Sequence, residues 1–227
     1  MQASNQIFIQ ELLIVFSAAG NYNEADAMSK YMRKRFSFFG IKSELRKSLQ
    51  KDFLSKYPLP QGDELKELIE KLWALPKREL HYFAIEILEK SIKKADESWM
   101  PQLEKLISEN SWWDTIDAVA SKLIGAYLKK YPQFCESYPE KWIRSDNFWF
   151  RRTALLYQLK YKKDTDFERL KNYILRTASE KEFFIQKAQG WTLREYAKTN
   201  PVLVRQFVAE NTSILSQLTK REALKNI

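Results

Sequence analysis

Apolar residues recur at helical spacing from the first residues of the chain onward. One such stretch covers about residues 4–19, and a second begins near Asn23 and is broken at Phe38-Phe39-Gly40. A third begins at Ser43, which we expect to cap it, and ends at Pro58. Apolar side chains three or four positions apart share one face of a helix. The first 60 residues therefore predict three amphipathic helices.

From about residue 60 the pattern repeats. Small residues stand at matching places in five longer helical stretches, 34, 36, 34 and 35 residues apart, at Ala84, Ala118, Ala154, Ala188 and Ala223. A shorter helical stretch precedes each one, at 63–73, 99–108, 138–144, 166–177 and 201–211. Two helices per repeat of this length are typical of an α-solenoid, in which small residues let neighbouring helices approach closely. We predict an all-α solenoid of helical hairpins, with residues 1–227 forming a single domain.

The composition supports helices and excludes several kinds of site. Only 5 Gly and 7 Pro occur in 227 residues, which favours helix over loops. Cys135 and His81 are the only residues of their types, so no disulfide within the chain and no zinc site of the usual Cys/His kind can form. We expect no metal and no cofactor. Single-copy repeats suggest a monomer.

The cellular location is also constrained. A chain without disulfides suits a reducing cytosol. The first apolar stretch is interrupted by Gln10 and Glu11 and has no basic residue before it, so we read it as neither a signal peptide nor a membrane span. We expect a cytoplasmic protein without a membrane partner.

A net charge of +9 indicates a polyanionic partner. Basic residues flank the predicted helices: Lys42, Arg46, Lys47, Arg151, Lys160, Lys162, Lys163, Lys198, Lys220 and Arg221. A basic surface of this length can follow a nucleic-acid backbone without reading its sequence. For each lysine taken alone, a solvated helix face is the alternative.

Three of the longer helices carry an aromatic residue and a charge on one face. These sets are Trp113 with Asp117, Trp149 with Arg152, and Lys187 with Trp191 and Arg194. Their spacings of three, four or seven residues place each set on one side of a helix. A core would not hold so many charges, and a merely solvated face would not carry three tryptophans. Trp149 fits either the core or a cleft, whereas Trp112 is expected to pack inward and Asp114 to occupy the helix end.

Asp117 is the one acid among these bases, and no metal cluster or proton donor accompanies it in the sequence. A lone carboxylate can stabilise a developing cation or orient a water molecule. A glycosidic bond to an already cationic base suits such a site, because the base leaves neutral and needs no general acid. The sugar then becomes the cation that a carboxylate stabilises, and indole faces also favour cations. An N-alkylated purine in DNA is a substrate of this kind.

The sequence resembles the AlkD-like DNA alkylation repair glycosylases over nearly its whole length. The motifs that carry the resemblance are Ser111-Trp112-Trp113-Asp114-x-x-Asp117, Ser145-Asp146-Asn147-x-Trp149-x-x-Arg152 and Lys181-Glu182-Phe183-Phe184-Ile185-Gln186-Lys187-Ala188-x-Gly190-Trp191-x-x-Arg194-Glu195-Tyr196-Ala197. Further matching segments are Tyr31-Met32, Phe39-Gly40-Ile41 and Leu72-Trp73-x-Leu75-Pro76-x-Arg78-Glu79. The motif from Lys181 to Ala197 is the most specific of these.

This resemblance implies a C-shaped array of HEAT-like repeats that excises cationic N3- and N7-alkylated purines from double-stranded DNA. It implies that the lesion is processed without base flipping and that an abasic site is left. Asp117 would be the catalytic acid, Trp113 and Trp191 would contact the deoxyribose and backbone, and Arg152 would be catalytically important. Arg194 and Tyr31 would belong to the same cleft. Lys42-Ser43 replaces a Gln-Thr pair that the family has at a DNA-contacting turn.

Two other interpretations stay open at this point. A catalytically silent HEAT-repeat scaffold would bind nucleic acid without releasing a base, although the intact set of Asp117, Arg152 and the tryptophans argues against it. A protein-binding solenoid is the commonest use of such arrays, and the basic excess argues against that.

Overall fold

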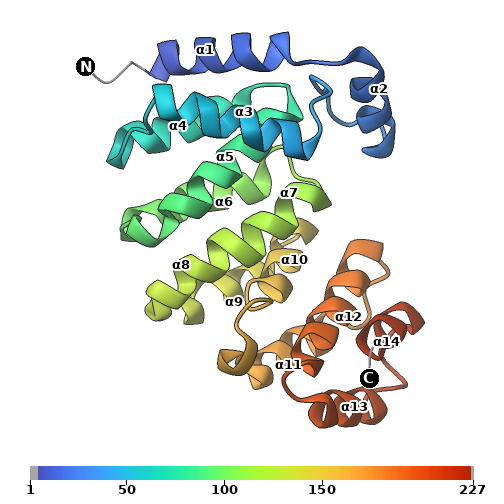
Figure 1. The fold of residues 1–227 in the computed structure, drawn as a ribbon. Coiled ribbons are helices and arrows are strands. Elements are labelled where there is room, and N and C mark those ends of the chain that lie inside the picture. Colours follow the sequence, from blue (N-terminus) through green and yellow to red (C-terminus); the bar gives the residue numbers. More distant parts are fainter. Residues whose placement is uncertain (1–4, 226–227) are drawn as a thin grey trace. The chain divides into compact units, whose positions relative to one another are not determined.

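A computed structural model describes residues 5–225, so residue 4, the expected start of the first helix, lies outside the described part. Within that part the regular structure is helical, and the only extended pairing is an isolated bridge between Ser37 and Lys77. The all-α prediction is confirmed. The chain divides into two compact units, residues 1–91 and 92–227 (Figure 1). None of the described helices combines the length and apolar character needed to cross a bilayer.

Unit 1 (residues 1–91) contains α1 (Asn5–Ala18), α2 (Tyr22–Tyr31), α3 (Ser43–Lys56), α4 (Gly62–Ala74) and α5 (Arg78–Ser91). Its core forms because apolar residues four apart lie on one face of α1: Phe8, Leu12 and Phe16 are all buried. Phe8 meets Phe53 of α3 edge to face, with ring centroids 4.9 Å apart. Aromatic packing of this kind joins α1 to α3 and α5.

The loop between α2 and α3 is held by a buried acid. The Glu79 carboxylate accepts backbone N–H bonds from Phe39, Gly40 and Ile41, at 3.0, 2.8 and 3.2 Å. Gly40 has φ +89°, and a Cβ there would lie 2.0 Å from the Asn21 carbonyl oxygen, so glycine is required. This loop leads into Lys42 and Ser43 at the start of α3.

The expected helix cap at Ser43 is wrong by one residue. Lys42 is the N-cap of α3, with an extended backbone and no side-chain capping bond. The Arg46 N–H already bonds to the Lys42 carbonyl at 2.9 Å, so the first helical hydrogen bond begins one residue before Ser43.

Unit 2 (residues 92–227) contains three kinds of helix. The α-helices are α6 (Met100–Ser108), α7 (Trp113–Ala118), α8 (Gly125–Lys130), α9 (Tyr138–Ile143), α10 (Phe148–Leu156), α11 (Phe167–Arg176), α12 (Phe183–Ala197), α13 (Pro201–Glu210) and α14 (Gln217–Ala223). Short 3₁₀ helices lie at Ile92–Lys94, Glu97–Trp99, Pro132–Glu136 and Lys162–Asp164. A π-helical segment, η3 (Val119–Ile124), joins α7 to α8.

The predicted helix pairs are confirmed. The longer helices pack in chain order within unit 2, η3 against α10, α10 against α12, and α12 against α14. Ala84, Ala154, Ala188 and Ala223 are buried as expected, but Ala118 is only half-buried. The next residue, Val119, is the buried one there. The C-shaped curvature and the single domain stay predictions.

Candidate active site

Asp117 and Arg152 form the centre of the candidate site in unit 2. Arg152 donates Nε–H to Asp117 Oδ1 at 2.8 Å and Nη2–H to Oδ2 at 3.0 Å. Its third donor, Nη1, bonds to the Phe184 carbonyl oxygen on α12. A guanidinium matches a carboxylate in this two-bond geometry better than an ammonium group does. One arginine on α10 therefore ties the Asp117 helix to the start of α12.

Both partners are largely withdrawn from water. The side chain of Arg152 is 5% exposed and that of Asp117 is 20% exposed. Burial raises the pKa of the Asp117 carboxyl above its ordinary value, and the nearby Asp114 adds to this, while the charge and hydrogen bonds of Arg152 oppose it. The pair thus holds a poorly solvated carboxyl group that keeps a remaining opening to solvent.

The local backbone also positions Asp117. Helix α7 begins after Trp112, its N-cap, which has an extended backbone and makes no side-chain capping bond. Asp114 lies in the first turn, where a negative charge is favourable, and so occupies the helix end as expected. Directly after α7 the chain enters the π-helical turn, and the Ser121 hydroxyl donates to the Asp117 carbonyl oxygen at 2.6 Å. Single π turns within α-helices are frequent at functional sites.

An aromatic cluster adjoins the pair through Phe184, whose ring centroid lies 5.8 Å from the Arg152 guanidinium. Trp112 is buried, and its ring centroid is 5.8 Å from that of Trp149 and 5.3 Å from that of Phe184. Trp149 is 7% exposed and also packs on Phe148 and Phe184. Inward packing of Trp112 is confirmed, and the burial of Trp149 favours the core alternative over a DNA contact. Trp113, four residues before Asp117, is half-buried.

The third predicted set lies on α12. Trp191 is half-buried, and Lys187 and Arg194 precede and follow it at helical spacing. Both bases are engaged by Glu222 of α14, which accepts from Lys187 Nζ at 2.8 Å and from Arg194 Nη1 at 2.7 Å. The sequence interpretation named neither Glu222 nor its effect on these two bases.

A regular register links these charges and would have revealed Glu222. Asp117 and Arg152 are 35 residues apart, and so are Lys187 and Glu222. Arg152 and Lys187 are separated by the same interval in the sequence. One position per repeat therefore carries an acid, a base, a base and an acid in turn. The first acid bonds to the first base, and the second base bonds to the second acid. Counting one repeat onward from Lys187 identifies Glu222.

The other predicted DNA contacts fall into two groups. Arg46 and Arg151 are paired with acids, Arg46 through two bonds of 2.9 Å to Glu86 and Arg151 through bonds of 2.9 and 2.8 Å to Glu180. Lys42 is exposed and pairs with Glu24 at 2.7 Å. Tyr31, Ser43 and Lys47 are exposed, Tyr31 to 71%.

Unit 1 brings several of these residues together. Tyr31, Ser43, Arg46 and Tyr82 line one pocket of about 330 Å³, otherwise apolar. The Arg46 guanidinium lies 5.2 Å from the centroid of the Tyr82 ring. The predicted residues of α2 and α3 therefore do share one surface feature.

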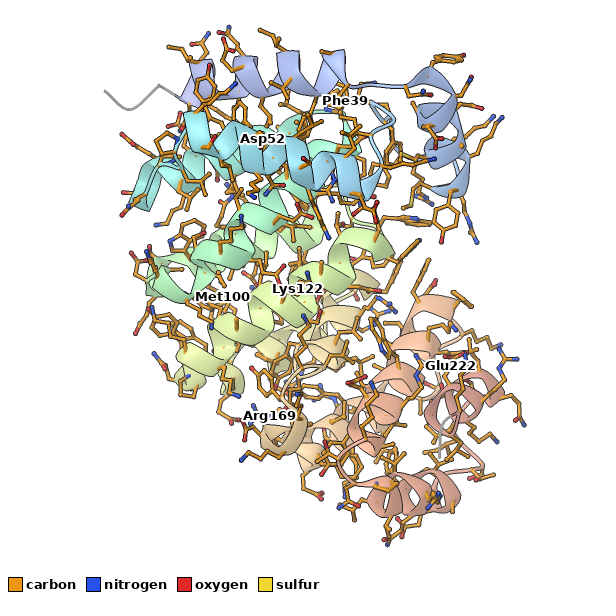
Figure 2. The ribbon with its side chains drawn as sticks, in the orientation of Figure 1. Phe39, Asp52, Met100, Lys122, Arg169 and Glu222 are labelled. Carbon is orange, nitrogen blue, oxygen red and sulfur yellow. The ribbon has the colours of Figure 1, made fainter. Side chains whose placement is uncertain are left out.

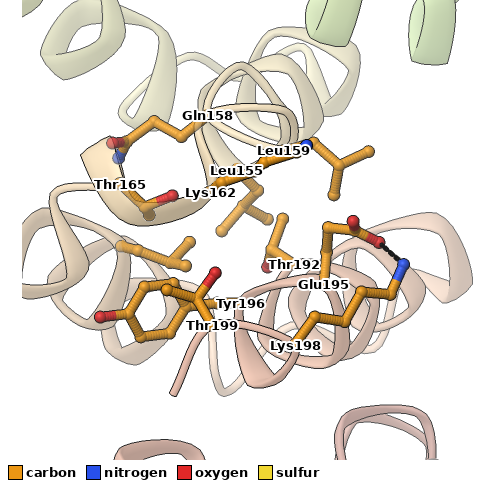
Figure 3. A pocket seen from close by; sticks show the side chains of 11 residues that line it. Leu155, Gln158, Leu159, Lys162, Thr165, Thr192, Glu195, Tyr196, Lys198 and Thr199 are labelled. Atoms are coloured by element: carbon orange, nitrogen blue, oxygen red, sulfur yellow. Dashed lines mark hydrogen bonds and ion pairs between the residues drawn. The ribbon is translucent and has the colours of Figure 1, made fainter. Parts of the chain in front are cut away.

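A separate pocket of about 310 Å³ opens in unit 2 between the end of α10, α11 and α12 (Figure 3). Glu195 and Lys198 pair at its edge, 2.6 Å apart, and the residues that line it include none of the catalytic candidates. Among residues 5–225, no three His, Cys, Asp or Glu side chains gather in a way that could hold a metal ion.

Comparison with known proteins agrees with this fold. Residues 12–227 match the family described as DNA alkylation repair enzyme. The chain belongs to that family. A solved structure of a predicted DNA alkylation repair enzyme from Enterococcus faecalis is 32% identical, with a TM-score of 0.84 over 92% of this chain and 96% of that one.

A second solved structure, of a protein from Streptococcus mutans, is 20% identical, with a TM-score of 0.60 over 81% of this chain and 98% of that one. At this identity the likeness supports the fold alone. A comparison with curated proteins gave no match. Membership of the DNA alkylation repair enzyme family confirms the expectation of an enzyme that acts on DNA, and leaves its substrate and mechanism to be proposed.

Proposed function

We propose that this DNA alkylation repair enzyme is a glycosylase that hydrolyses the N-glycosidic bond of cationic N3- and N7-alkylated purines in double-stranded DNA, without base flipping. The observation that carries the proposal is the Asp117–Arg152 pair, a mostly buried carboxylate held by two hydrogen bonds on a tryptophan-bearing helix. A structural ion pair on the surface would leave the carboxylate solvated and its pKa unraised.

The reaction suits the groups available. The bond between C1′ and the purine nitrogen breaks, and its electron pair goes to the base, which departs neutral because it began as a cation. The sugar then carries the positive charge of an oxocarbenium ion, which the Asp117 carboxylate stabilises. A water molecule attacks C1′ and loses a proton to Asp117 or to solvent, which leaves an abasic site.

The neighbouring residues support this role for Asp117. Arg152 fixes both carboxylate oxygens and so sets the direction in which the charge is presented. Trp113 shares the Asp117 face of α7, and Trp191 lies half-buried on α12. Indole faces at these positions would contact the deoxyribose and favour the cationic species by about 0.5–2 kcal/mol each.

The proposal is tested by measuring release of 7-methylguanine and 3-methyladenine from methylated duplex DNA. We expect the wild type to release the bases. For Asp117→Asn the rate should fall by at least about 100-fold, as it does when other charge-stabilising groups are removed from enzymes. Asp164→Asn is the matched control, because Asp164 forms an exposed pair with Lys129 at 2.7 Å in the same unit. Equal rates for wild type and Asp117→Asn would exclude Asp117, and binding without release by any variant would indicate a silent DNA-binding scaffold.

A further inference from the structure

Glu222 bridges two bases on the candidate DNA-binding face. Its carboxylate accepts from Lys187 at 2.8 Å and from Arg194 at 2.7 Å, one oxygen for each base. Its side chain is 12% exposed, whereas the side chains of Lys187 and Arg194 are 36% and 22% exposed. The bases thus keep access to solvent while the acid lies beneath them, at the junction of α12 and α14 (Figure 2).

The position of Glu222 is built into the packing of α14 on α12. A Cβ at Gly190 would lie 2.4 Å from the Glu222 Cβ and 2.8 Å from the Thr219 carbonyl oxygen, so glycine permits the close approach of the helices. The Thr219 hydroxyl bonds to Gln189 Oε1 at 2.8 Å and to the Gln186 carbonyl at 3.2 Å. Helix α14 is therefore held in register with α12, and Glu222 is held with it.

Glu222 also belongs to the register that carries the catalytic candidates. It follows Lys187 by the same 35 residues that separate Asp117 from Arg152. The bases lower the pKa of the Glu222 carboxyl, chiefly through the hydrogen bond from Lys187, so the acid is ionised at neutral pH. A negative charge here repels DNA phosphates and neutralises Lys187 and Arg194, which lie at helical spacing from Trp191.

We propose that Glu222 is a specificity-determining residue that occupies Lys187 and Arg194 in the free protein and makes DNA phosphates compete for them. The inference rests on the proposed function, since it assumes that this face binds DNA. Phosphate contacts are the same on damaged and undamaged DNA, so weakening them lowers non-specific affinity. Contacts from Asp117 and the tryptophans to an alkylated nucleotide are kept, so the preference for damaged sites rises.

The test is the binding of a fluorescent undamaged duplex at several salt concentrations. For Glu222→Gln we expect tighter binding at low salt. The slope of log K, the association constant, against log salt should be steeper by about 1–2, because each freed base adds one phosphate contact and each contact contributes about 0.9 to the slope. Glu168→Gln is the charge-matched control, because Glu168 pairs with Lys171 at 2.8 Å on the surface of α11. A slope for Glu222→Gln no steeper than that of Glu168→Gln, or weaker binding, would overturn the proposal.

Arg194→Gln gives an independent answer if Glu222→Gln does not fold. An arginine already held by Glu222 contributes less than a full phosphate contact, so its loss should reduce the slope by clearly less than about 0.9. A full loss of about 0.9 would overturn the proposal. Base release from methylated DNA is measured on the same preparations. Release with unchanged slopes would reject only the role of Glu222, whereas altered slopes without release would reject only the proposed glycosylase.

Discussion

Two tryptophans on neighbouring repeats, Trp113 and Trp149, have different surroundings. Trp149 is 7% exposed within an aromatic cluster, whereas Trp113 is half-buried beside Asp117. We expect Trp149→Ala to lower the free energy of unfolding by about 3 kcal/mol, because it leaves a cavity. Trp113→Ala should unfold at nearly the wild-type urea concentration and release 7-methylguanine more slowly. If Trp149→Ala unfolded like the wild type and lost activity, its indole would belong to the DNA-binding surface.

The titration of Asp117 predicts how base release depends on pH. Burial raises the pKa of this carboxyl above its ordinary 3.8, and Arg152 works against that rise. In the proposed mechanism the carboxylate is the active form, so the rate should fall as the pH drops through a pKa higher than 3.8. Arg152→Lys loses the two-bond geometry and should move this fall to higher pH. The measurement is the rate of base release against pH, with release by Asp117→Asn subtracted to remove acid depurination, and an unmoved profile in Arg152→Lys would contradict it.

At the scale of helices, the contact of α12 with α14 depends on Gly190. In an open helix, Gly→Ala stabilises by about 0.5–1 kcal/mol. At Gly190 the new methyl group would lie 2.4 Å from the Cβ of Glu222, an atom fixed to the backbone. We therefore expect Gly190→Ala to destabilise the protein by about 1–3 kcal/mol, as overpacking does. Thermal unfolding checks the sign, and a raised midpoint would show that α14 moves aside without cost.

The elements differ in how far the sequence could predict them. Apolar periodicity located helices that bury one face, such as α4 and α11. It failed for the end of α2, which stops at Tyr31 and not near Phe38, and which buries none of its residues. The cap of α3 and the π turn after Asp117 were not predictable, since both depend on hydrogen bonds and contacts made after folding. Gly125 illustrates this: a Cβ there would lie 2.4 Å from the Tyr157 carbonyl oxygen, a contact 32 residues away that no local pattern encodes.

The residues of the candidate site could be predicted from the sequence, but which of its bases are paired with acids was harder to predict. The stripes containing Asp117, Arg152 and Trp191 were found because spacing fixes a helix face. The pairing of Arg46 with Glu86 and of Arg151 with Glu180 was not found, because these partners lie 40 and 29 residues away and so do not follow the 35-residue register. A base is buried next to an acid only when two neighbouring repeats pack together, so the pattern of one helix does not predict it.

For the whole molecule, a net charge of +9 does not tell which of the 38 basic residues can meet DNA, because several of them are already paired with acids. Arg46 and Lys47, which are adjacent on α3, allow a paired base to be compared with an unpaired one. Arg46 is buried and doubly bonded to Glu86, while Lys47 is exposed and forms no ion pair within residues 5–225. Only a solvated base releases a condensed counterion by binding a phosphate at little cost to the fold.

Lys47→Gln should therefore reduce the slope of log K against log salt by about 0.9 and leave the unfolding midpoint unchanged. Arg46→Gln should leave Glu86 without its partner and lower the free energy of unfolding by about 2 kcal/mol. Its slope should stay near the wild-type value, because the paired guanidinium is not free to bind a phosphate. The two variants remove the same charge from adjacent positions, so net charge cannot explain a difference between them. Equal loss of slope in both would mean that the Arg46–Glu86 pair opens when DNA binds, and that paired bases count fully toward the DNA-binding charge.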